Sequence, residues 1–143
     1  MKENILELLK EQIRDEPFAN HMGISLQDVG PGYAVMEARF SEKMTNFNGL
    51  IHGGAIFALI DEAFGAASNS HGTIALALNL NVTYLESPRI NSLLIAEAKE
   101  ESRGKRTATY RIEVLEKGEN ENRKIALCQA IVYRKEKSLS FLE

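Results

Sequence analysis

The sequence predicts an α+β domain in which a curved antiparallel sheet wraps around one long central helix. Residues 55–67 form an apolar run that is broken only by Gly65 and by the pair Asp61-Glu62. A run of this length favours helix over strand, and Gly53-Gly54 before it and a Ser/Asn/Gly turn after it fit the two ends. Because the helix is apolar on nearly every side, it has to be buried on most of them. The remaining segments alternate apolar and polar residues between short turns, as antiparallel strands do.

The N-terminal segment, residues 1–17, is predicted to be helical over residues 2–14. Its apolar side chains recur at helical spacing with Lys and Glu between them, which is typical of a short surface helix. Pro17 should end the helix, because proline disfavours helical geometry in the residue before it. Residues 18–21 are expected to bridge to the first strand.

A β-hairpin is predicted next. Residues 23–29 alternate loosely and stop at Gly30-Pro31-Gly32, a strong turn signal. Residues 33–40 then alternate strictly, which predicts a strand with one better-buried face. The residues of that face are Ala34, Met36, Ala38 and Phe40.

The part of the chain after the central helix is predicted to form a meander of antiparallel strands. Residues 73–85 alternate strictly and predict a long strand, with leucines on one face and Ala75, Ala77 and Asn79 on the other. A face of small and polar residues suits a surface on which something packs closely. Further strands are predicted over residues 92–102, 107–116 and 124–134, and the charged tail over residues 136–143 is expected to be loose.

Composition limits the class of protein. The chain has 143 residues, of which 44% are apolar, so we expect one domain over residues 1–143 with a substantial core. A net charge of −3 gives no indication of nucleic-acid binding. The single cysteine, Cys128, fits a reducing cytoplasm. The first residues lack a signal peptide's apolar core, and the central run is too short and too acidic to span a membrane.

The residues themselves leave several chemical roles open. Asp61 or Glu62 could act as a base or nucleophile, and helical periodicity does not choose between them. Gly53-Gly54 either permits a close approach or presents free N–H groups that attract negative charge. Asn46 taken alone reads as a loop cap, and a histidine before two glycines, His52, is as often structural as catalytic.

An ordered set of residues resembles the hotdog-fold acyl-CoA thioesterases, above all the small bacterial phenylacetate-pathway branch. The resemblance spans residues 18–135, and the set is Asn46, Gly49, His52, Gly53, Gly54, Asp61, Phe64 and Asn69. It implies a hotdog fold with Asp61 as the general base or nucleophile. It also implies that the N–H of Gly53 and the amide of Asn46 stabilise the oxyanion, and that His52 helps to shape the site. Glu62 is then structural or interfacial.

The resemblance also implies a coenzyme A site. The basic turn Arg103-Gly104-Lys105-Arg106 would lie near the nucleotide end of coenzyme A, although composition alone favours a solvated turn. Arg89 is a second candidate, and Gly54 and Asn79 complete the predicted binding set. Where some relatives carry Ser or Thr to hold the attacking water, this chain has Ala77 and Asn79.

The sequence therefore predicts a cytoplasmic acyl-CoA thioesterase for an aryl or medium-chain acyl group. No metal or redox cofactor is implied. A non-catalytic acyl-CoA sensor and a hydratase on the same fold are the alternatives, but residues 1–17 are too short for the DNA-binding segment that usually accompanies a sensor. Gly53 and Asp61 are separated by eight residues, or ~12 Å along a helix. We therefore expect a homodimer or homotetramer whose active sites are shared between two chains.

Overall fold

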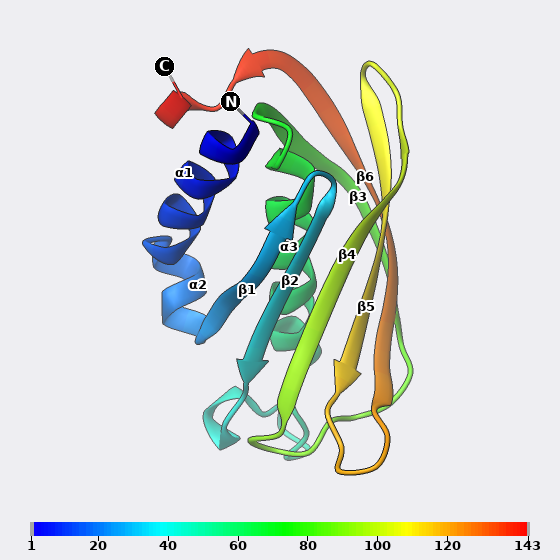
Figure 1. Cartoon of the computed structure of the whole chain (residues 1–143). Coiled ribbons are helices and arrows are strands. Elements are labelled where there is room, and N and C mark those ends of the chain that lie inside the picture. Colours follow the sequence, from blue (N-terminus) through cyan, green and yellow to red (C-terminus); the bar gives the residue numbers. More distant parts are fainter. Residues whose placement is uncertain (1, 143) are drawn as a thin grey trace.

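The computed structural model describes residues 2–142, and its architecture is six antiparallel strands around one central helix (Figure 1). The sheet order is β1-β2-β4-β5-β6-β3. The strands are β1 (Ile24–Gly30), β2 (Tyr33–Arg39), β3 (Thr73–Tyr84), β4 (Leu93–Arg103), β5 (Thr107–Glu116) and β6 (Arg123–Ser138). The helices are α1 (Lys2–Arg14), α2 (Pro17–Met22) and α3 (Gly53–Asn69), with short 3-10 helices η1 (Glu42–Met44) and η2 (Ser140–Leu142).

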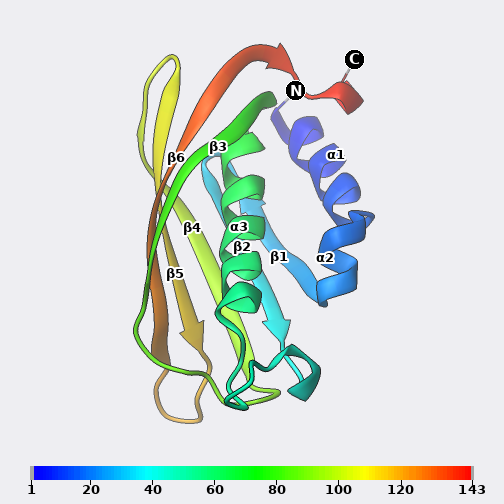
Figure 2. The same ribbon diagram turned by 180° about the vertical axis from the view of Figure 1, so that it is seen from behind.

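The helix α3 packs against the inner face of the curved sheet, as Figure 2 shows from behind. Its side chains Leu59, Ile60 and Ala63 are fully buried. Burying this many apolar side chains is the main stabilising contribution to the fold, at roughly 25 cal/mol per Å² of apolar surface. The predicted central helix is therefore confirmed. It is stable because the sheet buries the apolar side chains that such a helix cannot expose to water.

The predicted hairpin is also confirmed. Strands β1 and β2 pair antiparallel, with Gly30 opposite Tyr33 across the turn. The four residues expected on the buried face of the second strand lie between 0% and 3% exposed: Ala34, Met36, Ala38 and Phe40. The alternation in the sequence therefore identified the correct inner face of β2.

Two expectations near the chain ends are wrong. Residues 18–21 do not simply bridge to the sheet, because Pro17 begins the short helix α2, where a missing N–H and a fixed φ suit the first turn. The tail predicted over residues 136–143 is not loose where it is described. Strand β6 continues to Ser138, and the N–H of Leu139 donates to the carbonyl of Gly72 at 3.0 Å. Met1 and Glu143, which the predicted N-terminal segment and tail also included, lie outside the described residues.

Strand β3 does not keep one face throughout its length. Its pairing with β6 slips between Ala77 and Asn79, so a β-bulge falls at Leu78. Before the bulge, Ala75 and Ala77 face the helix; after it, Leu80 and Val82 pair with buried residues of β6 and take that side. The predicted strict alternation is therefore wrong, and Asn79 does not share a face with Ala77.

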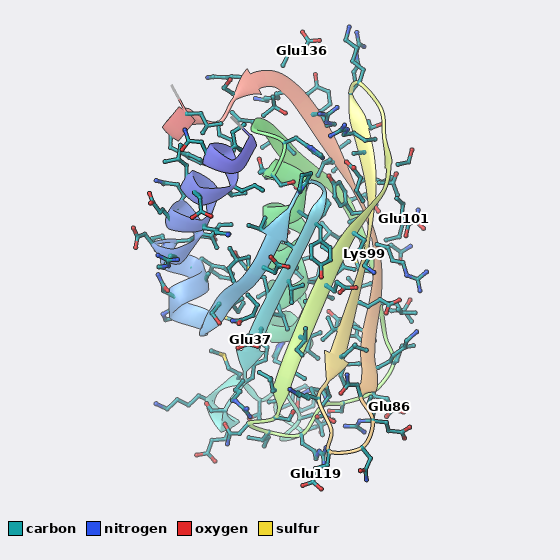
Figure 3. The ribbon with its side chains drawn as sticks, in the orientation of Figure 1. Glu37, Glu86, Lys99, Glu101, Glu119 and Glu136 are labelled. Carbon is teal, nitrogen blue, oxygen red and sulfur yellow. The ribbon has the colours of Figure 1, made fainter. Side chains whose placement is uncertain are left out.

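Charged side chains lie on the sheet's outer face and at the ends of the molecule (Figure 3). Lys99 of β4 pairs with Glu97 at 3.1 Å on that outer face. The side chains labelled in the figure include Glu37, Lys99 and Glu101 on the strands and Glu119 and Glu136 near the two ends. No helix within residues 2–142 has the length and hydropathy needed to cross a membrane.

Candidate active site

The loop before α3 is held in one shape by its own hydrogen bonds. Thr45 and Ile51 form an isolated antiparallel bridge, and the N–H of Asn46 donates to the carbonyl of Leu50 at 2.7 Å. The Asn46 side-chain oxygen accepts from the N–H groups of Asn48 and Leu50, at 2.9 and 3.1 Å. Asn46 is therefore the loop cap that composition suggested. Because its oxygen is occupied, its NH₂ group remains as a fixed donor.

His52 is the N-cap of α3. Its Nδ1 accepts a 2.8 Å hydrogen bond from the N–H of Gly54. A Cβ on residue 54 would lie 3.0 Å from that nitrogen, so Gly54 gives the cap its space. His52 thus shapes the start of the helix, and its Nδ1 is occupied by this hydrogen bond.

The N–H of Gly53, at the first position of α3, is not part of this cap. It makes no hydrogen bond to any group within residues 2–142, whereas the carbonyl of Gly53 accepts a 3.0 Å bond from the hydroxyl of Tyr84. Gly53, Asn46 and Tyr84 line an open cavity of about 400 Å³. A free N–H at a helix start beside a fixed amide donor suits an oxyanion. Sequence reasoning missed Tyr84, which lies at the end of a strand 31 positions away.

The carboxylates lie in the middle of the same helix. Asp61 and Glu62 line a second cavity, of about 470 Å³, between α3, β3 and α1. Partial burial, and then the negative charge of Glu16, raise the pKa of Asp61 above its usual value. Burial, a hydrogen bond to Glu16 and the charges of Glu16 and Asp61 raise the pKa of Glu62 to about 8. Asp61 therefore combines the raised basicity and the open side that a general base needs.

The structure does not bring the two halves of the predicted site together within one chain. Gly53 and Asn46 line one cavity, and Asp61 lines the other. Eight helical residues separate Gly53 from Asp61, a rise of ~12 Å. Asn79 is also not beside Asp61, because it pairs with Ile131 on the face of the sheet away from α3.

The family model described as the thioesterase superfamily matches residues 48–122, more than half of the chain. The chain belongs to the thioesterase superfamily. A relative of this thioesterase from Archaeoglobus fulgidus, whose name assigns it provisionally to the esterases, is 39% identical over 129 residues. That match covers 87% of this chain and 82% of the relative.

Two further comparisons define the branch. The acyl-coenzyme A thioesterase PaaI of Escherichia coli is 33% identical over 97 residues, which cover 68% of this thioesterase and 69% of PaaI. The solved structure of the E. coli PaaI protein from the phenylacetic acid degradation operon matches with a TM-score of 0.87 and 25% identity. It covers 96% of this chain and 98% of that one. The hotdog fold, the thioester hydrolase and the resemblance to the phenylacetate-pathway branch, all predicted from the sequence, are confirmed.

The basic turn of this thioesterase is only partly free to bind a ligand. The guanidinium of Arg103 lies 2.9 Å from Nε2 of His71 and 3.9 Å from Oε1 of Glu100. The same oxygen of Glu100 bonds to His71 at 3.0 Å and to the hydroxyl of Tyr110 at 3.1 Å. Arg103 is therefore held by a polar network at the end of α3, a long-range contact that the sequence did not indicate.

The other predicted cations differ in their partners. Lys105 pairs at 3.7 Å with Glu136, with both side chains exposed, which contributes little to stability. Arg106 forms no ion pair within residues 2–142. The carbonyl of Gly104 accepts from Arg134 at 2.7 Å, which fixes the turn. Arg89 lies 3.6 Å from the buried carboxylate of Glu116, so it serves a structural ion pair there.

Proposed function

We propose that this thioesterase hydrolyses an acyl-CoA with an aryl or medium-chain acyl group, giving a carboxylic acid and free coenzyme A. The observation that carries the proposed hydrolysis is the start of α3. There the N–H of Gly53 is unbonded within the described residues, and the loop around Asn46 is fixed beside it. Donors that are already in place stabilise a developing oxyanion without reorganisation.

The proposed reaction needs one carboxylate. Asp61 takes a proton from a water molecule, whose oxygen bonds to the thioester carbonyl carbon, and the carbonyl oxygen accepts hydrogen bonds from Gly53 and Asn46. The C–S bond then breaks, the acid forms, and the departing thiolate takes up a proton. Direct attack by Asp61 on the same carbon is the other route, with water releasing the acid from the resulting anhydride.

The site is completed by a second copy of the chain. One carbonyl has to lie within ~3 Å of both the attacking group and an oxyanion donor, and ~12 Å of helix separates the two in one chain. Two antiparallel α3 helices related by a two-fold axis would place Gly53 of one copy beside Asp61 of the other.

The exposed edge of the sheet supports this pairing. Strand β3 is an edge strand of 12 residues, whereas the opposite edge, β1, lies beside α1 and α2 (Figure 1). An open edge of this length is a ready template for another chain. Seven of the ten large apolar side chains that are exposed within the described residues lie on or next to β3 or near the start of α3: Phe47 (98%), Leu50, Phe57, Leu76, Leu78 (61%), Tyr84 and Leu85. Side chains of this kind are typical of a surface that another chain covers.

Coenzyme A would bind with its phosphates at the basic turn, chiefly through Arg106 and Lys105. These side chains carry their charge into solvent, while Arg103 is engaged by His71 and Glu100. The cations would pair with phosphate oxygens through charge-assisted hydrogen bonds.

The test of the function is thiol release from a panel of acyl-CoAs. The purified protein is assayed with short, medium, long and aryl acyl-CoAs, and free coenzyme A is measured with a thiol reagent. We expect turnover, with the highest kcat/KM for an aryl or medium-chain ester. Tight binding of the same esters without any thiol release would instead establish an acyl-CoA sensor.

A further inference from the structure

The cavity of about 470 Å³ between α1 and α3 is large enough for an acyl group. Asp61 lies in its wall, so a thioester placed for attack reaches this cavity. Most of the wall beyond Asp61 on α3 and β3 is formed by small or apolar residues, and Leu9 and Ile13 are the apolar residues that α1 contributes. At Gly65 the cavity is open, because a Cβ there would meet no atom within 4 Å.

One part of this wall is acidic. Glu16, at the junction of α1 and α2, and Glu62, on α3, line the same cavity as Asp61. Among the side chains described, in residues 4–142, no lysine or arginine lines it, and its other polar side chains are neutral: Gln12, Ser68 and Asn69. Burial, a hydrogen bond with Glu16 and the negative charges of Glu16 and Asp61 raise the pKa of Glu62 to about 8, so this acidic wall opposes a further negative charge.

We propose that α1 forms the outer wall of the acyl compartment, and that Glu16 and Glu62 in this wall exclude acyl groups that end in a carboxylate. Such a group would bring a second negative charge into a partly desolvated cavity that holds no cation to pair with it. A neutral chain of the same length contacts Leu9 and Ile13, and a terminal hydroxyl can hydrogen-bond to the carboxyl pair. This selectivity rests on the proposed function, because it concerns the acyl side of the same site.

The experiment compares three esters of matched length: hexanoyl-CoA, 6-hydroxyhexanoyl-CoA and adipoyl-CoA. For the wild type we expect kcat/KM to be at least ~100-fold lower for adipoyl-CoA than for hexanoyl-CoA. In the double variant Glu16→Gln/Glu62→Gln, the adipoyl-to-hexanoyl ratio of kcat/KM should rise at least ~10-fold. In Glu16→Gln alone the same ratio should rise by less, because Glu16 is partly exposed. Glu11→Gln is the matched control, because Glu11 is an exposed residue of α1 outside the cavity.

Binding supplies a readout that does not depend on turnover. Dissociation constants of the three esters are measured with Asp61→Asn alone, with Glu16→Gln added, and with Glu16→Gln/Glu62→Gln added. Glu16→Gln should tighten adipoyl-CoA selectively. If no ester is hydrolysed by the wild type, the proposed function fails, and the dissociation constants still decide the selectivity. An adipoyl-to-hexanoyl ratio unchanged by Glu16→Gln and by the double variant, in both readouts, would overturn the inference.

Discussion

The hydroxyl of Tyr84, at the end of β3, donates a 3.0 Å hydrogen bond to the carbonyl of Gly53, the first residue of α3. The Tyr84 ring also lies 3.5–3.6 Å from the position that a Cβ on residue 53 would occupy. Tyr84 therefore fixes the peptide group beside the proposed oxyanion donor, and the edge strand and the helix start are joined at this point.

Removing that hydroxyl should affect both stability and catalysis. We expect Tyr84→Phe to lose about 1 kcal/mol of unfolding free energy, a typical hydrogen-bond contribution, and to lower kcat several-fold by loosening Gly53. Tyr133→Phe is the control, because Tyr133 is also an exposed tyrosine and its hydroxyl makes no hydrogen bond within residues 2–142. Equal effects of the two substitutions on kcat would contradict the role of Tyr84.

Asp61→Asn should leave the fold intact and abolish turnover. The substitution keeps the size of the side chain while removing the base or nucleophile, so a loss beyond ~100-fold in kcat is expected. The measurement is thiol release at saturating acyl-CoA, with circular dichroism to confirm folding. Retention of more than about a tenth of the activity in Asp61→Asn, together with its loss in Glu62→Gln, would move the role to Glu62.

The two glycines Gly54 and Gly65 should respond to alanine with opposite signs. In Gly54→Ala the new Cβ meets Nδ1 of His52 at 3.0 Å, so the cap should be disturbed at a cost of about 1 kcal/mol. In Gly65→Ala the Cβ enters open space, and stability should rise by roughly 0.5–1 kcal/mol through helix propensity. Chemical denaturation of both variants checks this, and stabilisation by Gly54→Ala would show that the His52 cap contributes little.

The acid pair should make stability depend on pH. Because the pKa of Glu62 is raised from 4.5 to about 8 in the fold, the folded chain binds more protons than the unfolded chain between those values. The contribution of Glu62 to stability is therefore complete below pH ~4.5 and is lost as the pH rises through ~8. We expect the melting temperature of Glu62→Gln to fall less than that of the wild type over this range. If the melting temperatures of the two proteins changed equally with pH, the raised pKa of Glu62 would be contradicted.

Within the basic turn, we expect Lys105 and Arg106 to contribute to acyl-CoA binding and Arg103 to contribute to stability. Neutralising Lys105 and Arg106 together should raise KM for acyl-CoA with little change in kcat or in stability. Arg103→Gln should mainly destabilise the protein, because it removes a partner of His71 and Glu100. Thermal melts and steady-state kinetics of the two variants separate the effects. An unchanged KM in the Lys105/Arg106 variant would show that the turn is only a solvated surface.

The sequence predicted the elements whose signal is local. The burial of α3 follows from the apolar run over residues 55–67, and the inner face of β2 follows from its alternation. The helix α2 was missed because Pro17 was interpreted only as a stop signal, although proline also favours the first helical position.

The remaining features depend on contacts between distant parts of the chain. The bulge at Leu78 reverses the faces of β3, and nothing in the alternation of residues 73–85 marks it. The proximity of Glu16 to Glu62 and the attachment of Arg103 to His71 arise only when α1 and the β4–β5 turn are placed in space. The residues of the candidate site, and the separation of Gly53 from Asp61 along α3, could thus be predicted from the sequence, whereas the side chains that surround each of them could not.

The measurement that tests the shared active site is complementation between two inactive variants. One is Asp61→Asn, and the other combines Asn46→Ala with Gly53→Pro. Proline removes the N–H at a helix position that tolerates it, and the extended backbone of His52 (ψ 135°) suits a following proline. After the two variants are unfolded, mixed and refolded together, half of the dimers should be mixed. Each mixed dimer has one site with an intact loop and an intact Asp61, so about a quarter of the wild-type activity should return. Absence of activity, with mixed dimers detected by native mass spectrometry and both variants folded, would contradict a site shared between two chains.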